Sequence, residues 1–176
     1  MLSIRTARME DRDALRQLIE RSARELSVDD YQPEQVEGAL RGTFGVDSQL
    51  IHDGTYFVVE SDGVIVGCGG WSFRRTLFGG DTGAVRDSGE LDPRTDPAKI
   101  RAFFVDPQHA RRGIGTMLLQ QCESAARARG FLRAELMGTL PGVKLYAARG
   151  YLPAPMVTYE VAPGVMIQFI PMSKQI

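Results

Sequence analysis

The stretch from residue 99 to residue 130 constrains the fold of this chain more than any other. Lys99–Val105 is an apolar run that predicts a β-strand, and Met117–Arg129 repeats its apolar residues at helical spacing. Gly130 is placed to end that helix in the left-handed conformation. Between strand and helix lies the glycine-rich turn Arg111–Thr116. The sequence therefore predicts a strand–turn–helix unit with a glycine-rich turn at its centre.

The residue types of this turn suit a phosphate group. A helix that begins near Gly113 leaves its first backbone N–H groups without partners inside the helix, and they carry partial positive charge. Gly113 and Gly115 lack a Cβ atom, so an anion can approach the backbone closely. Thr116 adds a hydroxyl donor, and Arg111 and Arg112 add charges suited to a pyrophosphate. The alternative is an ordinary solvated helix start.

Two other phosphate motifs fit the turn less well. A Walker P-loop ends in Gly-Lys-Ser/Thr, whereas Gly115 and Thr116 are followed by Met117, with no lysine. A dinucleotide fingerprint needs a third glycine where this chain has Leu118. The turn thus predicts a phosphate-bearing cofactor of another kind.

Composition limits the remaining choices. A chain of 176 residues fits one domain, and its 43% hydrophobic and 24% charged residues are typical of an ordered globular protein. The formal net charge of −1 creates no field toward nucleic acid or a membrane. No apolar stretch approaches the ~20 residues of a membrane span, and no signal segment opens the chain. We therefore expect a cytoplasmic protein that binds neither nucleic acid nor a membrane.

The cysteines and histidines indicate no metal or thiol chemistry. Cys68 and Cys122 lie inside apolar stretches, where a reduced thiol behaves as a small core residue. His52 and His109 have no His, Cys or carboxylate partner at metal-ligand spacing. We expect two buried, unreactive thiols and no metal site.

The rest of the chain predicts strands and helices around the central unit, and Ser61-Asp62-Gly63 marks a tight hairpin. The expected order is strand Leu2–Thr6, a helix from about Leu15 to Leu26, a short helix after Pro33, strands Thr55–Glu60, Val64–Trp71 and Lys99–Val105, helix Met117–Arg129, strand Phe131–Met137, a short helix Leu145–Arg149, and strands Tyr151–Val161 and Val165–Ile170. This order predicts one mixed α/β sheet with helices on its faces.

Residues 72–98 interrupt this pattern with a long loop. The loop contains several glycines and prolines and shows no clear periodicity. Structureless loops of more than ~15 residues in compact domains are usually functional or disordered, so this one is a candidate lid or substrate loop, or else an insertion without a role. Trp71 and Phe73, at its start, are expected either to line a pocket or to complete the core.

Two segments together resemble the GCN5-related N-acetyltransferase family. Phe103–Val105 with the Asp-Pro turn, Arg111-Arg112-Gly113-Ile114-Gly115 and the apolar helix after it is similar to the core of that family. Leu145–Tyr151 resembles the family's closing helix and strand. The first position of the family's glycine motif falls on Ala110, and Gly138–Gly142 lacks the asparagine that many members carry.

The resemblance implies a fold for residues 1–176 as a single N-acetyltransferase domain. Its α/β fold is a single mixed, mostly antiparallel twisted sheet of about six to seven strands flanked by helices. Within that sheet, a splayed parallel pair, Lys99–Val105 and Phe131–Met137, would hold the cofactor.

The implied cofactor is acetyl-CoA, as cosubstrate. Its pantetheine arm would pair with the strand backbone, its pyrophosphate would lie on the glycine-rich turn, and a backbone N–H near Phe104 or Val105 would polarise the thioester carbonyl. The cofactor-binding residues implied by the resemblance are Phe103, Phe104, Val105, Arg111, Arg112, Gly113, Ile114, Gly115 and Thr116.

Tyr146 matches the family's tyrosine that protonates the leaving thiolate; the alternative is a packing residue on a short helix. Glu60, Asp81 and Glu90 are candidate bases for the incoming ammonium, and a water chain is equally acceptable. His109 is expected near the distal end of the cofactor.

The resemblance thus implies an N-acetyltransferase that moves an acetyl group from acetyl-CoA to a primary amine, of a small-molecule acceptor, by direct attack. The alternative is a non-catalytic acetyl-CoA-binding sensor or partner-binding module. The sequence indicates neither the acceptor nor whether the chain forms a homodimer.

Overall fold

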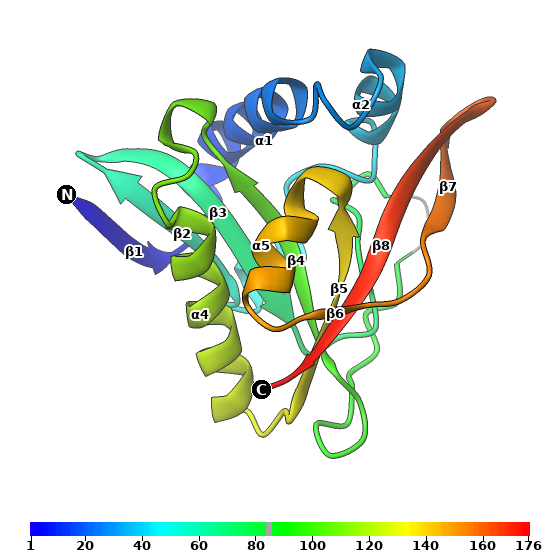
Figure 1. Ribbon diagram of the computed structural model, residues 1–176. Coiled ribbons are helices and arrows are strands. Elements are labelled where there is room, and N and C mark those ends of the chain that lie inside the picture. The colour runs from blue at the N-terminus through cyan, green and yellow to red at the C-terminus, as the bar shows by residue number, and fades with distance from the viewer. Residues whose placement is uncertain (84–85) are drawn as a thin grey trace.

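The computed structural model describes residues 1–83 and 86–176, which form one twisted sheet with helices on both faces (Figure 1). No helix within those residues is both long and apolar enough to cross a membrane. The elements, in chain order, are β1 (Leu2–Thr6), η1 (Met9–Asp11), α1 (Arg12–Leu26), α2 (Pro33–Ala39), α3 (Ser48–His52), β2 (Tyr56–Ser61), β3 (Val64–Ser72), β4 (Ala98–Val105), η2 (Pro107–His109), α4 (Ile114–Ala128), β5 (Arg133–Thr139), η3 (Leu140–Gly142), α5 (Val143–Ala148), β6 (Leu152–Pro153), β7 (Val157–Ala162) and β8 (Val165–Gln175).

The strand order is β1-β2-β3-β4-β5-β8-β6, with β7 paired to β8. All of these pairings are antiparallel except β4 with β5, which confirms the mixed, mostly antiparallel sheet. The sheet has eight strands in the described residues, against the six or seven expected. The difference arises at Pro153 and Pro155, whose missing N–H donors divide the expected strand Tyr151–Val161 into β6 and β7.

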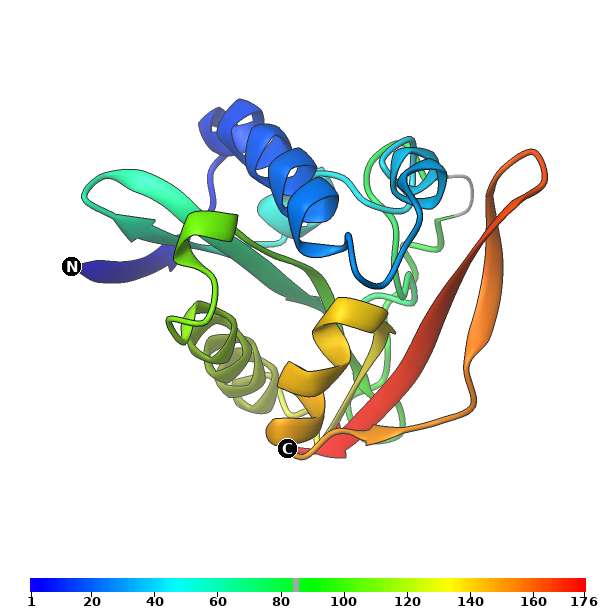
Figure 2. The ribbon, with the colours of Figure 1, turned by 45° about the horizontal axis from the view of Figure 1, so that its top comes forward.

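Helices cover the two faces of the sheet separately. Figure 2 shows α1 and α2 on one face and α4 and α5 on the other. Alternation along β2 explains the two cores, because successive side chains of a strand point to opposite faces. Tyr56 packs in the cluster that includes Leu15 and Leu18 of α1, whereas Phe57 packs in the cluster that includes Leu118 of α4.

Strands β4 and β5 pair over only three residues and then separate. The parallel register runs from Ala98–Ala134 to Ile100–Leu136 and stops there. On the other edge of β4, the register with β3 shifts just beyond Arg101. Ala102, at the shift, has φ +57, a left-handed conformation that costs a non-glycine residue about 1–2 kcal/mol. The splayed parallel pair expected from the sequence is therefore present, and it opens after Ile100, next to this bulge.

The loop between β3 and β4 covers the expected loop 72–98, of which residues 84–85 lie outside the described residues. A fully buried carboxylate, Asp47, ties this loop to the sheet. Asp47 accepts from Arg86 of the loop at 2.8 Å and pairs with Arg101 of β4 at 2.5 Å. Arg101 also donates to the carbonyl of Gly79 at 2.7 Å. Arg86 and Gly79 of the loop are thus fixed beside Arg101, near the point where β4 separates from β5.

The aromatic residues at the start of the loop belong to the core. Trp71 and Phe73 are buried, and the Trp71 ring lies 5.8 Å from the ring of Phe131. The guanidinium of Arg129 covers the Phe73 ring at 3.5 Å. Of the two roles left open by the sequence, the structure therefore supports core packing.

We predict that Asp47→Ala strongly destabilises the fold. It would leave Arg101, whose side chain is 2% exposed, as a buried charge without its carboxylate. Breaking such a pair from one side costs about 3–5 kcal/mol. The measurement is the free energy of unfolding in urea.

Glu37→Ala is the matched control, because Glu37 pairs with Arg24 where both side chains are about half exposed. The free energy of unfolding of this variant should fall by less than about 1 kcal/mol. Equal losses for the two variants would contradict the proposed importance of the buried pair.

Candidate active site

A groove of about 560 Å³ runs past the open end of β4, the start of α4 and α5. Eight of the nine cofactor-binding residues predicted from the sequence line it, together with Tyr146. The exception is Arg112, which is exposed and is not among the lining residues. The eight are Phe103, Phe104, Val105, Arg111, Gly113, Ile114, Gly115 and Thr116. Tertiary structure therefore gathers the strand, the turn and the tyrosine helix around one groove.

The turn before α4 has an unusual backbone. Arg111 has φ +65 and Gly113, the N-cap residue, has φ +83. The first backbone bond inside the helix is from Met117 N–H to the Gly113 carbonyl at 2.9 Å. The N–H groups of the preceding residues 114–116 consequently have no acceptor within the helix, and a glycine cap offers no side chain to them. The turn presents donors to the groove.

The two glycines of the turn serve different purposes. A Cβ at Gly113 would meet no atom within 4 Å, so glycine is needed there for the backbone conformation. A Cβ at Gly115 would lie 2.7 Å from Leu145 Cδ2. Gly115 thus lets α4 approach α5, the helix that carries Tyr146, in addition to the anion approach expected from the sequence.

Both backbone N–H groups expected to polarise a thioester have partners within the protein. Val105 donates to the hydroxyl of Ser22 on α1 at 3.2 Å. Phe104 is paired with Cys68 of β3 in the antiparallel ladder. Ser22 and Val105 both line the groove. A ligand bound there can therefore replace the Ser22 hydroxyl as the acceptor of the Val105 N–H. The Val105 N–H is the donor of the two that a ligand in the groove can engage.

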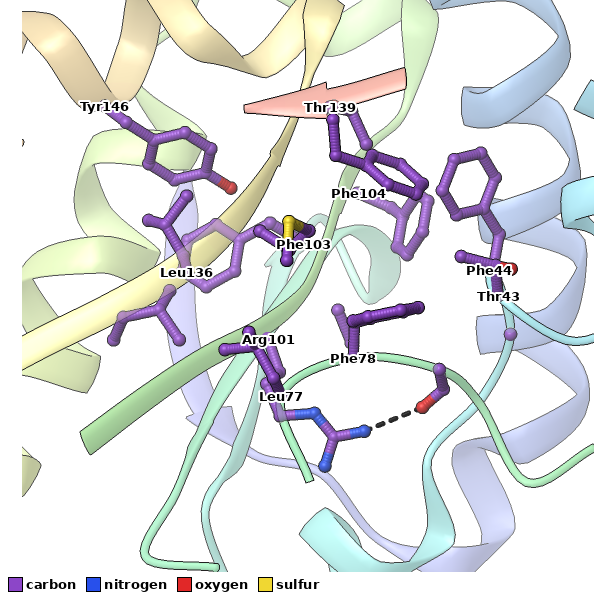
Figure 3. Close-up of a pocket in the computed structure, with 16 residues that line it drawn as sticks. Thr43, Phe44, Leu77, Phe78, Arg101, Phe103, Phe104, Leu136, Thr139 and Tyr146 are labelled. Atoms are coloured by element: carbon purple, nitrogen blue, oxygen red, sulfur yellow. Dashed lines mark hydrogen bonds between the residues drawn. The ribbon is translucent and has the colours of Figure 1, made fainter. Parts of the chain in front are cut away.

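A second, smaller pocket of about 70 Å³ lies in the opening between β4 and β5 (Figure 3). Its walls come from β4, β5, β8, α5, the segment after α2 and the loop that Asp47 fixes. The pocket and the groove share five lining residues: Phe44, Phe103, Phe104, Thr139 and Tyr146. The two cavities therefore meet at these five residues, Tyr146 among them.

Packing holds Tyr146 at this junction. Its ring lies 6.1 Å from the Phe103 ring and 6.0 Å from the Tyr151 ring, both edge to face. Figure 3 shows its hydroxyl directed toward the pocket. Burial, and secondarily the thiol of Cys122, raises the pKa of the Tyr146 phenol well above its usual value. The phenol therefore keeps its proton at neutral pH and can donate it.

The remaining candidate groups lie away from the junction. Glu60 pairs with Arg5 at 2.7 Å, and Asp81 binds the Ser48 hydroxyl at 2.6 Å. The backbone of Glu90 forms an isolated antiparallel β-bridge with the backbone of Arg74. None of these acids lines the groove or the pocket.

His109 belongs to η2, just before the glycine-rich turn. Its Nδ1 lies 3.3 Å from Asp106, which caps η2 and accepts from Arg21 of α1 at 3.0 Å. Asp106 is thus a turn residue, as expected. His109 lies beside the turn but is not among the groove-lining residues.

Sequence reasoning missed several lining residues. Phe44, Phe78 and Phe169 line the pocket, and Ser22 lines the groove. Each comes from a different segment, and no motif marks any of them in the sequence. Only Phe78 lies in a region that the sequence analysis had marked as a candidate substrate loop.

Comparison with known families decides what kind of protein this is. The model of the Acetyltransferase (GNAT) family matches residues 13–151. The chain belongs to the GNAT acetyltransferase family. It is accordingly an enzyme of the N-acetyltransferase class, as the resemblance of its motifs implied.

Solved structures show the same fold at low identity. A GCN5-related N-acetyltransferase from Rhodopseudomonas palustris is similar with a TM-score of 0.73 and 22% identity, over 99% of this chain and 95% of the other. The PaiA N-acetyltransferase from Thermoplasma acidophilum, solved with coenzyme A, is similar with a TM-score of 0.69 and 14% identity, over 100% of this chain and 99% of the other. A ribosomal-protein-alanine N-acetyltransferase from Brucella melitensis is similar with a TM-score of 0.65 and 17% identity, over 99% of each chain. No curated protein matches the chain.

The thiols of this GNAT acetyltransferase are buried and free. Burial raises the pKa of the Cys68 thiol to about 12, and it raises the pKa of Cys122 well above its usual value. A thiol is nucleophilic only as thiolate, so neither is activated. Within residues 1–83 and 86–176, no group of three or more His, Cys, Asp or Glu side chains is arranged to hold a metal ion.

We predict that neither thiol reacts with a chromogenic disulfide in the folded protein at about pH 8, because both are buried and protonated. After unfolding in guanidinium, both cysteines of the sequence should react at once. The readout is the absorbance of the released thiol. A thiol that reacts at full speed before unfolding would contradict this assignment.

Proposed function

We propose that this acetyltransferase, as one domain of residues 1–176, transfers the acetyl group of acetyl-CoA to the primary amine of a small molecule. The observation that carries the proposal is the meeting of the groove and the pocket at Tyr146. Such an arrangement lets a cofactor and an acceptor approach one point from two sides, which is the main requirement of a direct transfer.

The groove suits acetyl-CoA in several respects. The backbone of β4 beyond Ile100 has no partner in β5 and can pair with the amides of a pantetheine arm. The N–H groups at residues 114–116 and the side chain of Arg111 suit a pyrophosphate. Coenzyme A is present in the structure of the Thermoplasma acidophilum relative, which supports the same choice here.

Acetyl-CoA supplies the acetyl group as a thioester. Direct attack by an amine turns the sulfur into a leaving thiolate that needs a proton. Tyr146 is protonated at neutral pH and lies where the cavities meet, so we propose it as the general acid. The N–H of Val105, once released from Ser22, is suited to bind the thioester oxygen as charge develops on it.

We predict that Arg111→Ala weakens coenzyme A binding by about 10–100-fold, the value of one charge-assisted hydrogen bond. Arg127→Ala is the control, because it removes the same charge from the far end of α4, where Arg127 is exposed. Calorimetric titration of coenzyme A measures both. If Arg111→Ala binds as tightly as the control, the phosphates do not lie on this turn.

We predict that Tyr146→Phe lowers kcat by about 10²-fold or more, because the leaving sulfur loses its proton donor. The Kd of acetyl-CoA should change by no more than about twofold, since the ring that packs on Phe103 is kept. Thiol release with an amine panel gives the rates. Tyr159→Phe, on β7 and outside both cavities, should leave kcat unchanged.

Two outcomes would count against this proposal. Equal rates for Tyr146→Phe and the unaltered protein would remove Tyr146 from the mechanism. Tight acetyl-CoA binding with no thiol release for any amine would instead favour a non-catalytic sensor.

A further inference from the structure

The pocket between β4 and β5 has aromatic walls. Phe44, Phe78, Phe104 and Phe169 come from four separate segments and surround it. The ring centroids of Phe44 and Phe104 lie 5.8 Å apart, and those of Phe78 and Phe169 lie 6.0 Å apart. Aromatic walls of this kind favour a flat, apolar ligand, because rings prefer edge-to-face and offset contacts with other rings.

The pocket has room for part of a single ring. Its volume is about 70 Å³, whereas one water molecule needs about 10–15 Å³ by the same measure. An apolar cavity of about 150 Å³ accepts benzene, so this pocket encloses about half of that space. The remainder of a ring would lie at the opening that the pocket shares with the groove, beside Tyr146.

The charge around the pocket disfavours a cation. Arg101 is the only fully charged side chain among the described lining residues, and it is positive. Asp47 lies behind Arg101 and is shared with Arg86, so two cations face one carboxylate. The Nε of Arg101 is buried and has no hydrogen-bond partner in the described residues. An ammonium ion would lose its water here and gain no anion in return.

The pocket also offers no acceptor for a proton. Its described lining residues include no carboxylate and no imidazole, and Tyr146 is their only other titratable group. An alkylammonium must release a proton before its nitrogen can attack. An amine that is already neutral at pH 7 does not need this step.

We infer that the acceptor is an aromatic amine, uncharged at neutral pH, whose ring enters this pocket with its amino group toward Tyr146. The inference rests on the proposed function and specifies its acceptor. In the reaction, the nitrogen–carbon bond forms and the carbon–sulfur bond breaks. The sulfur takes the proton of Tyr146, and the proton lost by the nitrogen restores that phenol, so no net proton is released.

Aniline and benzylamine test the inference, because they differ by one methylene and, at pH 7, by one charge. The assay follows thiol release from acetyl-CoA by the full chain. We expect kcat/KM for aniline to exceed that for benzylamine by at least about tenfold, the effect of about 1.4 kcal/mol. Hexanoyl-CoA should be a poorer donor than acetyl-CoA, since the pocket is assigned to the acceptor.

The pH dependence gives an independent readout. Between about pH 6 and about pH 9, kcat/KM for aniline should be flat, because aniline stays neutral and Tyr146 stays protonated. The titratable and charged groups that face the amine here are Tyr146 and Arg101, with Asp47 and Arg86 behind. For an alkylamine, kcat/KM should rise about tenfold per pH unit over this range, because the fraction of amine that has lost its proton rises tenfold.

Phe78→Leu tests the place of the ring. Phe78 lines the pocket and not the groove, so KM for aniline should rise about tenfold while the Kd of acetyl-CoA stays unchanged. Phe57→Leu, in the core of β2 and outside both cavities, is the matched control and should leave KM unchanged. Unchanged KM in folded Phe78→Leu, with acetyl-CoA still bound, would overturn the inference.

The assay separates this inference from the proposed function. Preference for benzylamine, or for hexanoyl-CoA as donor, would overturn the aromatic acceptor and leave the acetyltransferase assignment intact. Absence of thiol release with every amine, aniline and benzylamine included, would overturn both.

Discussion

At Ala102 the backbone of β4 takes φ +57, and the pairing of the strand changes on both edges. Toward β3 the register shifts, and toward β5 the hydrogen bonds have already stopped at Ile100. A regular parallel pair would continue and fill the centre of the sheet. The bulge instead opens a space between two strands that stay joined at one end, and it leaves backbone donors and acceptors facing that space. Both the groove and the aromatic pocket depend on this opening.

An opening in a sheet must be closed from outside, or it would fill with water. The buried pair of Asp47 and Arg101 provides part of this closure, because it fixes the loop that carries Phe78 against β4. Helix α5 closes the other side and places Tyr146 at the junction of the cavities. Its position depends in turn on Gly115, which allows α4 and Leu145 to come close. Strain at the bulge and a desolvated ion pair thus support the walls of the site.

The sequence predicted the elements whose local patterns are strong. Strands β2, β3 and β4 lie within one residue of their predicted bounds, and helix α4 begins three residues before the predicted Met117 and ends one residue before Arg129, because their periodicities and turn residues agree. Helix α3 was missed, since five residues are too few for a helical period to appear. Strand β5 begins two residues later than predicted, because Gly130 at φ +95 and buried Phe131 complete the turn after α4. The C-terminal strands divide differently, owing to prolines whose effect depends on pairing with β8.

The sequence by itself determined the glycine-rich turn, the strand before it and the tyrosine helix, since each is a local pattern with a local physical cause. It therefore also determined the family. Only the tertiary structure decided that Trp71 and Phe73 lie in the core while Phe44, Phe78 and Phe169 line the pocket. Aromatic side chains look alike in a sequence whether they face a core or a cavity. The difference depends on which segments meet across the opening of β4 and β5, and such long-range contacts leave no periodic pattern to read.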